Sequence, residues 1–179
     1  VVPGGFVKNT PTAGLGKIPY GLSYAMTSYA AYMGTEPYEQ AYKDLRAVSV
    51  VIPANYYQFI VSRDAGYDSI KQIIENQAPI KLAVDQKGSA GEIITRQILQ
   101  AYGISYDDII AWGGSVDHLS GSKTFELMAD HRIDVTADAV SVPSSDILEA
   151  STTIDLSLLS LEEDIIQTVS DELGMTPGT

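Results

Sequence analysis

The chain has 179 residues and a mass of 19.2 kDa, which is enough for one substantial core or for two small lobes. Its content of 45% hydrophobic and 19% charged residues is typical of a folded globular protein and argues against a disordered tail. The formal net charge of -12 repels phosphate backbones and anionic lipid headgroups, so it argues against nucleic-acid and membrane-surface partners. No apolar run approaches the ~18 residues that span a bilayer. The absence of cysteine excludes disulfides and thiolate chemistry.

Charge and aromatic residues divide the chain into two compositional halves. Residues 1–80 carry six basic and six acidic side chains, whereas residues 81–179 carry five basic and seventeen acidic ones. All eleven tyrosines lie between Tyr20 and Tyr106. This division predicts two lobes. The opening residues form neither a Met start nor a signal peptide, so we expect a chain that is processed or cut from a longer protein.

Apolar runs of strand length alternate with helix-like segments along the sequence. In chain order the pattern predicts a strand at 21–25, a helix to Met33, strands at 47–52 and 57–62, a short helix at 68–74, a strand at 80–85, helices at 89–102 and 123–130, a strand at 133–139, a helix at 143–150, a strand at 156–161 and a helix at 162–169. Such alternation is typical of an α/β protein with largely parallel sheets.

Signatures of catalysis and metal binding are mostly missing from the sequence. It contains no phosphate-binding P-loop and no G-x-S-x-G nucleophile elbow. His118 and His131 are too far apart for an H-E-x-x-H zinc motif. The acidic run Glu162-Glu163-Asp164 favours a helix start over a calcium site, because no Asp-rich loop with a central glycine surrounds it.

The turn between the strand at 80–85 and the following helix is the strongest candidate for a binding site. Ser89 and Glu92 have the spacing of a capping box, which predicts a helix start. The small residues Gly88, Ala90 and Gly91 allow a ligand to approach the backbone, and the free N–H groups of a first turn attract a carboxylate or phosphate. An ordinary, well-capped strand-to-helix turn has the same pattern, so both interpretations stay open.

Four ordered groups of motifs carry a family resemblance that extends over essentially the whole chain. They are Gly4-Gly5-Phe6-Val7-Lys8-Asn9; Leu45-Arg46-Ala47-Val48 with Tyr57-Gln58-Phe59-Ile60-Val61; Val84 through Glu92 to Gly103 with Asp107-Asp108-Ile109; and Ile133-Asp134-Val135 with Val142-Pro143 and Leu158-Leu159-Ser160-Leu161. In this order they resemble the TAXI-type solute-binding proteins of tripartite ATP-independent periplasmic (TRAP) transporters.

The resemblance implies an α/β, two-lobed type II periplasmic-binding-protein-like fold. Crossover strands near 57–63 and 161–163 would join the lobes, which close on a small ligand and hand it to a membrane permease. It also implies no catalysis, no cofactor and an extracytoplasmic location. Residues 1–60 and 164–179 would form an incomplete lobe 1, because the family's opening strand and closing segments have no counterpart here, and residues 61–163 would form a complete lobe 2.

The resemblance further implies a ligand site between the lobes. Its expected residues are Gly4, Gly5 and Asn9 from lobe 1, Ser89, Ala90 and Gly91 from lobe 2, and Tyr24 and Asp138 near the rims. Asp138 could pair with a ligand amine or be a solvated acid at a strand end, and Tyr24 could contact the ligand or pack between helices.

Departures from the family pattern leave the ligand open. The Q-S-D of the family becomes Tyr24-Ala25-Met26 here, and the Thr of its G-S-G-T-E turn becomes Gly91. Amino acids such as glutamate and small dicarboxylates are the family's usual cargo. Two other functions remain as alternatives: a ligand-sensing effector domain of the same bilobal fold in a signalling or regulatory protein, and an enzyme of this fold acting on a bound carboxylate.

Overall fold

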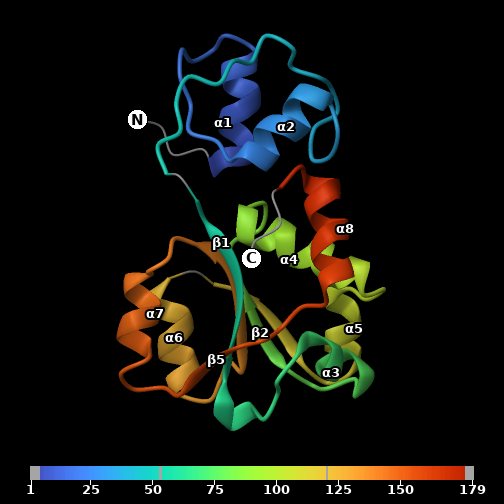
Figure 1. The fold of residues 1–179 in the computed structure, drawn as a ribbon, viewed down its shortest axis with the longest axis vertical. Coiled ribbons are helices and arrows are strands. Elements are labelled where there is room, and N and C mark those ends of the chain that lie inside the picture. Colours follow the sequence, from blue (N-terminus) through green and yellow to red (C-terminus); the bar gives the residue numbers. More distant parts are fainter. Residues whose placement is uncertain (1–4, 53, 120, 176–179) are drawn as a thin grey trace.

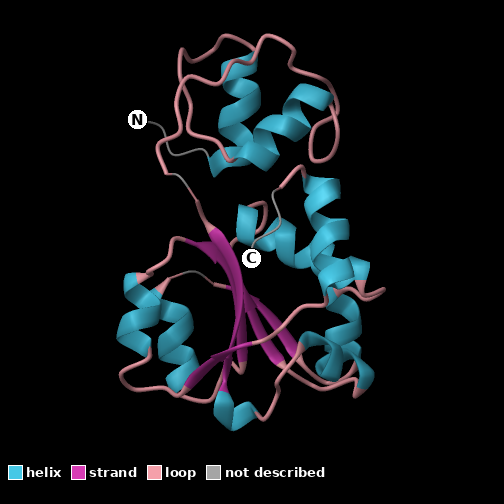
Figure 2. Ribbon diagram, in the orientation of Figure 1, coloured by secondary structure: helices cyan, strands magenta, loops and turns pink. Residues whose placement is uncertain are grey.

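The computed structural model describes residues 5–52, 54–119 and 121–175, arranged as a smaller helical part above a larger part built on one sheet (Figures 1 and 2). The helices are α1 (Gly5–Gly14), α2 (Ala25–Met33), α3 (Ile70–Glu75), α4 (Ala90–Ala101), α5 (Tyr106–Ala111), α6 (Ser122–Ala129), α7 (Ser145–Ala150) and α8 (Glu163–Leu173), with a 3-10 turn at Arg63–Ala65. The strands are β1 (Tyr56–Ser62), β2 (Lys81–Val84), β3 (Ser115–His118), β4 (Val135–Val140) and β5 (Leu156–Leu158).

The five strands form a mixed sheet in the order β3-β2-β4-β1-β5. Strand β2 pairs in parallel with β3 and β4, as the alternation of strands and helices predicts. Strand β1 runs antiparallel to both β4 and β5. It is the strand by which the chain enters the sheet from the N-terminal helices (Figure 1). The prediction of parallel pairing is therefore confirmed for β3, β2 and β4. It is wrong for β1, which is antiparallel to both of its neighbours.

Alternating side chains of the strands contribute to two hydrophobic cores, one on each face of the sheet. Leu82, Val84 and Val135 lie in the main core together with buried residues of α3, α4 and α8. Ala83 belongs instead to a smaller core with residues of α6. Because neighbouring residues in a strand face opposite sides, Thr136 lies on the α6 and α7 face of β4.

The described N-terminal residues, 5–52, contain helices α1 and α2 but no strand, so the strands predicted at 21–25 and 47–52 are wrong. Side-chain hydrogen bonds hold the first segment against α1: the Asn9 amide donates to the Leu22 carbonyl at 3.2 Å, and the hydroxyls of Thr10 and Ser23 lie 2.7 Å apart. The second segment has no regular secondary structure and lies at the surface, with Val48 77% exposed. A β-branched run forms a strand only where a partner strand completes its hydrogen bonds, and none is described beside it.

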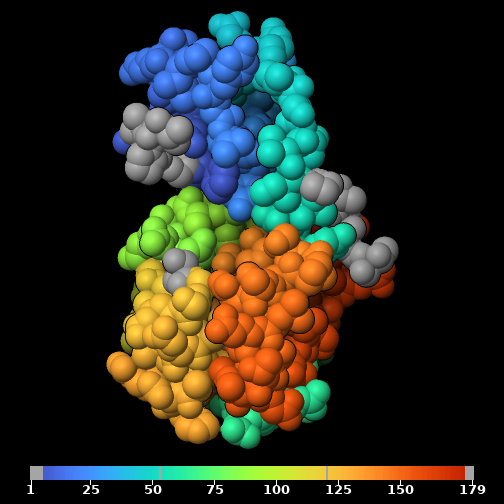
Figure 3. Space-filling model, turned by 90° about the vertical axis from the view of Figure 1, so that its left-hand side faces the viewer, coloured from blue at the N-terminus to red at the C-terminus, as the bar shows by residue number. Residues whose placement is uncertain are grey.

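The helical part rests directly on the sheet part. Val7, Tyr24 and Met26 pack into the main hydrophobic core, and α2 contacts α8, which itself lies against α4. Figure 3 shows the N-terminal residues (blue to cyan) stacked on the larger body, with the green segment that includes α4 between them. The predicted crossover at 57–63 coincides with β1 and its continuation, and the one at 161–163 leads into α8. The lobe boundaries themselves stay a prediction.

Candidate functional site

Ser89 caps the first turn of α4, as the sequence pattern predicts, but the return bond to Glu92 comes from Gly88 rather than from Ser89 itself. The Ser89 hydroxyl accepts a hydrogen bond from the Glu92 backbone N–H at 3.2 Å. The Glu92 carboxylate in turn accepts from the N–H of Gly88 at 3.2 Å, one residue before the cap. Arg96 lies one turn further along and pairs with Glu92 at 3.5 Å. These contacts fix the start of the helix at Ala90, where the structure places it.

Gly91 has a packing role in addition to its predicted binding role. A β-carbon at this position would collide with Oδ1 of Asp138, and it would lie 3.2 Å from the Cα of Asp138 and 3.3 Å from the nitrogen of Ala139. The missing side chain therefore lets the end of β4 lie against the first turn of α4. The space above Gly91 that we expected for a ligand is occupied by the Asp138 carboxylate.

Negative charge gathers around this turn. Burial and, after it, the nearby carboxylate of Asp85 together raise the pKa of Asp138 to about 6, although a hydrogen bond of 2.6 Å from the Ala139 N–H opposes the change. Asp85 follows β2 directly. A ligand carboxylate at the α4 N-terminus would gain the dipole and the free N–H groups, but it would also meet these two acids.

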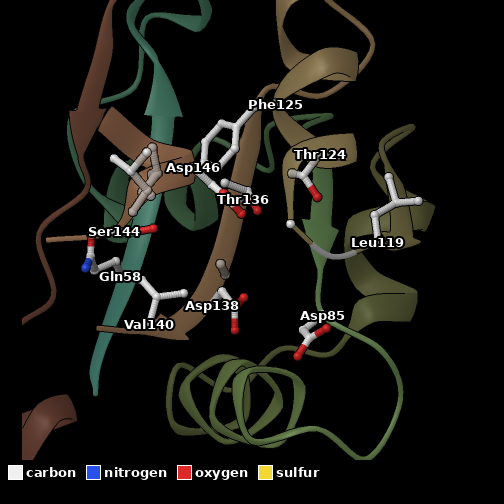
Figure 4. A pocket seen from close by; sticks show the side chains of 14 residues that line it. Gln58, Asp85, Leu119, Thr124, Phe125, Thr136, Asp138, Val140, Ser144 and Asp146 are labelled. Atoms are coloured by element: carbon white, nitrogen blue, oxygen red, sulfur yellow. The ribbon is translucent and has the colours of Figure 1, made fainter. Parts of the chain in front are cut away.

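A pocket of about 50 Å³ opens between the sheet and helices α6 and α7 (Figure 4). Its walls combine aliphatic and aromatic side chains with seven polar ones, three of them carboxylates. The lining residues are Gln58, Ile60, Asp85, Leu119, Gly121, Thr124, Phe125, Thr136, Ala137, Asp138, Val140, Ser144, Asp146 and Ile147. Gln58 and Asp138 are directly opposite each other on β1 and β4, so the β1–β4 pairing sets the floor of the pocket.

A chain of buried hydroxyls fixes α4 against the sheet beside this pocket. The Tyr57 hydroxyl donates to Oγ1 of Thr95 at 2.9 Å, and the Thr95 hydroxyl donates to the Gly91 carbonyl at 2.6 Å. Burial raises the pKa of Tyr57 well above its usual value, although the Thr95 hydrogen bond opposes the change. Tyr57 therefore stays neutral and acts as a hydrogen-bond donor that positions the α4 turn.

Tyr24 brings the helical part to the same place. Its ring centroid lies 4.2 Å from that of Phe6, and its hydroxyl accepts a hydrogen bond from the Asn55 amide at 3.3 Å. Burial raises the pKa of Tyr24, and the charges of Asp138 and Asp85 contribute to the same direction, because both acids are near its hydroxyl. The structure thus brings Tyr24 and Asp138 together at the boundary between the two parts of the chain.

The structure gives less support to the other site residues that the resemblance implies for lobe 1. Gly4 lies outside the described residues, and Gly5 is the first residue of α1. The Asn9 amide is used within the helical part, where it holds the segment after α1. Sequence reasoning missed Asp85, Thr136 and Asp146. Two sequence signals could have identified them. One is an acid directly after a predicted strand, and the other is the presence of polar residues at alternate positions of the next predicted strand.

Two kinds of feature are absent from the described residues. No helix among them is both long and apolar enough to cross a membrane. Within the same residues no group of three or more histidine, cysteine or acidic side chains is arranged to hold a metal ion.

Comparison with solved structures identifies the class of fold to which this chain is similar. The structure of the alkanesulfonate-binding protein SsuA from Xanthomonas axonopodis pv. citri, bound to MOPS, matches 97% of this chain and 60% of its own with a TM-score of 0.51 at 17% identity. The chain therefore has the fold of a periplasmic solute-binding protein, as the sequence predicts, and spans about 60% of the length of that protein. A solved structure described as a two-component system protein that mediates signal transduction matches 59% of this chain and 37% of its own, at 9% identity. Its TM-score of 0.41 is too low to support an inference.

The match to a protein family covers almost the whole sequence. The profile of the NMT1-like family matches residues 2–178. This match includes both the helical part and the sheet part, and it extends over every candidate site residue. The chain belongs to the NMT1-like family.

Proposed function

We propose that this chain is the solute-binding component of a TRAP-type transporter of the TAXI kind. It captures a small carboxylate-bearing solute, such as glutamate, another amino acid or a dicarboxylate, and delivers it to a membrane permease from an extracytoplasmic location. The order of motifs along the chain and the solute-binding-protein fold support this function. It involves no catalytic step.

One observation carries the proposal: the first turn of α4 lies where the two parts of the chain meet. The N–H groups of Ala90 and Gly91 start the longest described helix, and a helix N-terminus suits a carboxylate. The Ser89 N–H donates to the Gln86 carbonyl at 2.9 Å and would have to exchange this bond for one to the ligand. Tyr24 approaches from the helical part and Asp138 from the sheet part. A ligand between them would contact both parts, which is the arrangement that links binding to closure.

Closure in this proposal is a movement of lobe 1 on lobe 2. Residues 1–60 and 164–179 form lobe 1, residues 61–163 form lobe 2, and the chain passes between them at β1 and before α8. Gly4, Gly5, Asn9 and Tyr24 face the ligand from lobe 1 in the closed state. Removing water from the cleft then strengthens the polar contacts with the solute.

The test is a direct measurement of ligand binding by the purified 179-residue chain. We expect calorimetry to detect micromolar binding of glutamate, of succinate or of both, because two or three charge-assisted hydrogen bonds of ~1.5–3 kcal/mol each reach this range. Small-angle X-ray scattering with and without the ligand should show a decrease in the radius of gyration. A folded chain that binds no amino acid and no dicarboxylate would contradict the proposal.

A further inference from the structure

We propose that the apolar run at residues 47–52 docks onto the same run of a second copy of this chain, so that the two form an antiparallel pair of strands. The run has the sequence Ala47-Val48-Ser49-Val50-Val51-Ile52. None of the residues expected to contact the solute lies in it. The pairing is therefore independent of the proposed solute-binding function.

The run is open to solvent and has the composition of a strand. Its three valines and its isoleucine are between 62% and 78% exposed. None of the backbone-to-backbone hydrogen bonds that the described residues form in turns and loops involves residues 47–52. Valine and isoleucine favour strands, and the backbone groups of such a run can pair with those of another strand. Strand addition from a partner would complete both features at once.

The accessible surface of the chain is larger than that of a compact monomer of the same mass. It measures 10645 Å². A compact monomer of 19.2 kDa exposes about 8400 Å², which leaves an excess of about 2200 Å². A standard interface between two proteins hides about 800 Å² on each partner. The excess is therefore enough for a stable interface between two copies.

Exposed apolar side chains are concentrated in the helical part, residues 5–52. This part is less than a third of the described chain, but it contains ten of the fifteen large hydrophobic side chains that the described residues expose. Four of the ten belong to the run. Figure 3 shows cyan residues, the colour of this region, on the outside of the helical part. The surface available for docking therefore lies at this end of the molecule.

The distribution of charge favours a second copy as the partner. Residues 5–52 carry four basic and three acidic side chains, whereas the remainder of the chain carries seven basic and twenty acidic ones. The helical part lies at one end of the long axis (Figure 1). Two copies that meet through this end keep their acidic parts apart, so salt screens much of the repulsion between them.

The run also matches itself in an antiparallel pair. It has no charged residue, so no like charges would face each other across the pair. A pair centred on Val50 places this residue opposite its own copy and Val48 opposite Ile52 of the partner subunit. Pairs of β-branched residues in these positions stabilise a sheet. Because a two-fold axis uses the same surface on both copies, the assembly closes as a dimer.

The first experiment measures the mass of the whole chain in solution by light scattering after size-exclusion chromatography, over a range of concentrations. We expect twice the chain mass of 19.2 kDa. Val50→Lys should weaken the dimer at least tenfold and leave the circular dichroism spectrum unchanged, because a lysine on an exposed strand edge opposes pairing. Leu148→Lys is the matched control, since Leu148 is 58% exposed on α7, outside the helical part, and should not affect the dimer.

The second experiment uses the absence of cysteine from the chain. Residues directly opposite each other in an antiparallel pair have Cα atoms about 4.5–5.5 Å apart, within reach of a disulfide. Under mild oxidation we expect Val50→Cys to form a covalent dimer. Val48→Cys should cross-link only when mixed with Ile52→Cys, and Leu148→Cys should stay monomeric on a non-reducing gel.

The possible results separate this pairing from other partners and other surfaces. A folded chain that is monomeric at every concentration would overturn the inference and would leave the exposed run to a different protein. A dimer that Val50→Lys does not weaken and that none of the cysteines in the run cross-links would show that another surface pairs. Species larger than a dimer would contradict a closed two-fold arrangement. Ligand affinity, which tests the proposed function, is a separate measurement.

Discussion

Gly91, in the first turn of α4, lies so close to Asp138 at the end of β4 that no β-carbon fits between them. The contact joins a helix start to a strand end 47 positions away in the sequence. It also places a carboxylate at the positive end of the helix, where a negative charge is favourable. The same glycine thus serves the packing of the fold and the electrostatics of the candidate site.

Substituting Gly91 with alanine should destabilise the protein. The added methyl group collides with Asp138 and has no room to move away from the β4 backbone, so we expect the free energy of unfolding to fall by about 1–3 kcal/mol. Urea unfolding followed by circular dichroism measures this change. Gly21→Ala is the matched control, because its β-carbon would make only ordinary contacts at 3.5 Å. Equal stability of the Gly91 variant and wild type would contradict the observed packing.

The charge of Asp138 should cost stability at high pH. The folded protein raises the pKa of this group from 3.8 to about 6, so it holds the proton more tightly than the unfolded chain does. The cost is absent below about pH 3.8 and complete above about pH 6. Asp138→Asn should therefore stabilise the protein at pH 8, by about 1 kcal/mol because solvent screens the partly exposed group.

Urea unfolding of wild type and Asp138→Asn at pH 8 and pH 4.5 tests this dependence. The gain should shrink at the lower pH, where wild-type Asp138 is largely protonated. The groups that face Asp138 are Asp85 and Asp146 in the pocket and the hydroxyls of Tyr24 and Tyr57. A gain that is the same at both pH values would show that the effect is not caused by the titration of Asp138.

Local sequence signals predicted the elements whose contacts are local. The Ser89 and Glu92 pattern gave the start of α4, and Gly34, which has a left-handed conformation, gave the end of α2. The cap of α3 is displaced by one residue, since the Ser69 hydroxyl, rather than Asp68, accepts from the Gln72 N–H. The capping interactions of Ser105 and Asp108 at α5 were also readable but were missed.

Features that depend on partners distant in sequence could not be predicted. Strand β3 is short and has only Val116 as an apolar residue, so it forms through its pairing with β2 rather than through its own composition. The run at 47–52 has a strong strand pattern, but none of the strands that the structure describes lies beside it. The pocket requires the ends of β2 and β4 and the start of α7 to meet, and only the topology of the sheet brings Asp85, Asp138 and Asp146 together.

The hydroxyl chain from Tyr57 through Thr95 should be energetically coupled. Thr95→Val leaves the buried Tyr57 hydroxyl without its acceptor, so we expect a loss of about 1–3 kcal/mol in the free energy of unfolding. Tyr57→Phe removes the donor and should cost less. In a double-mutant cycle the pair should cost less than the sum of the single changes, and strict additivity would show that the hydrogen bond contributes nothing.

The hydroxyl of Tyr24 should contribute to ligand affinity, because it approaches Asp138 from the opposite part of the chain. Tyr24→Phe keeps the ring contact with Phe6 and removes only the oxygen that accepts from Asn55. One lost hydrogen bond of ~0.5–1.5 kcal/mol corresponds to about a two- to tenfold weaker affinity for glutamate, measured by calorimetry. Tyr32→Phe is the control, since Tyr32 is exposed and its ring can still contact the Lys43 ammonium. If both variants bind glutamate like wild type and remain folded, Tyr24 only packs between α1 and α2, and the ligand contacts the helical part elsewhere.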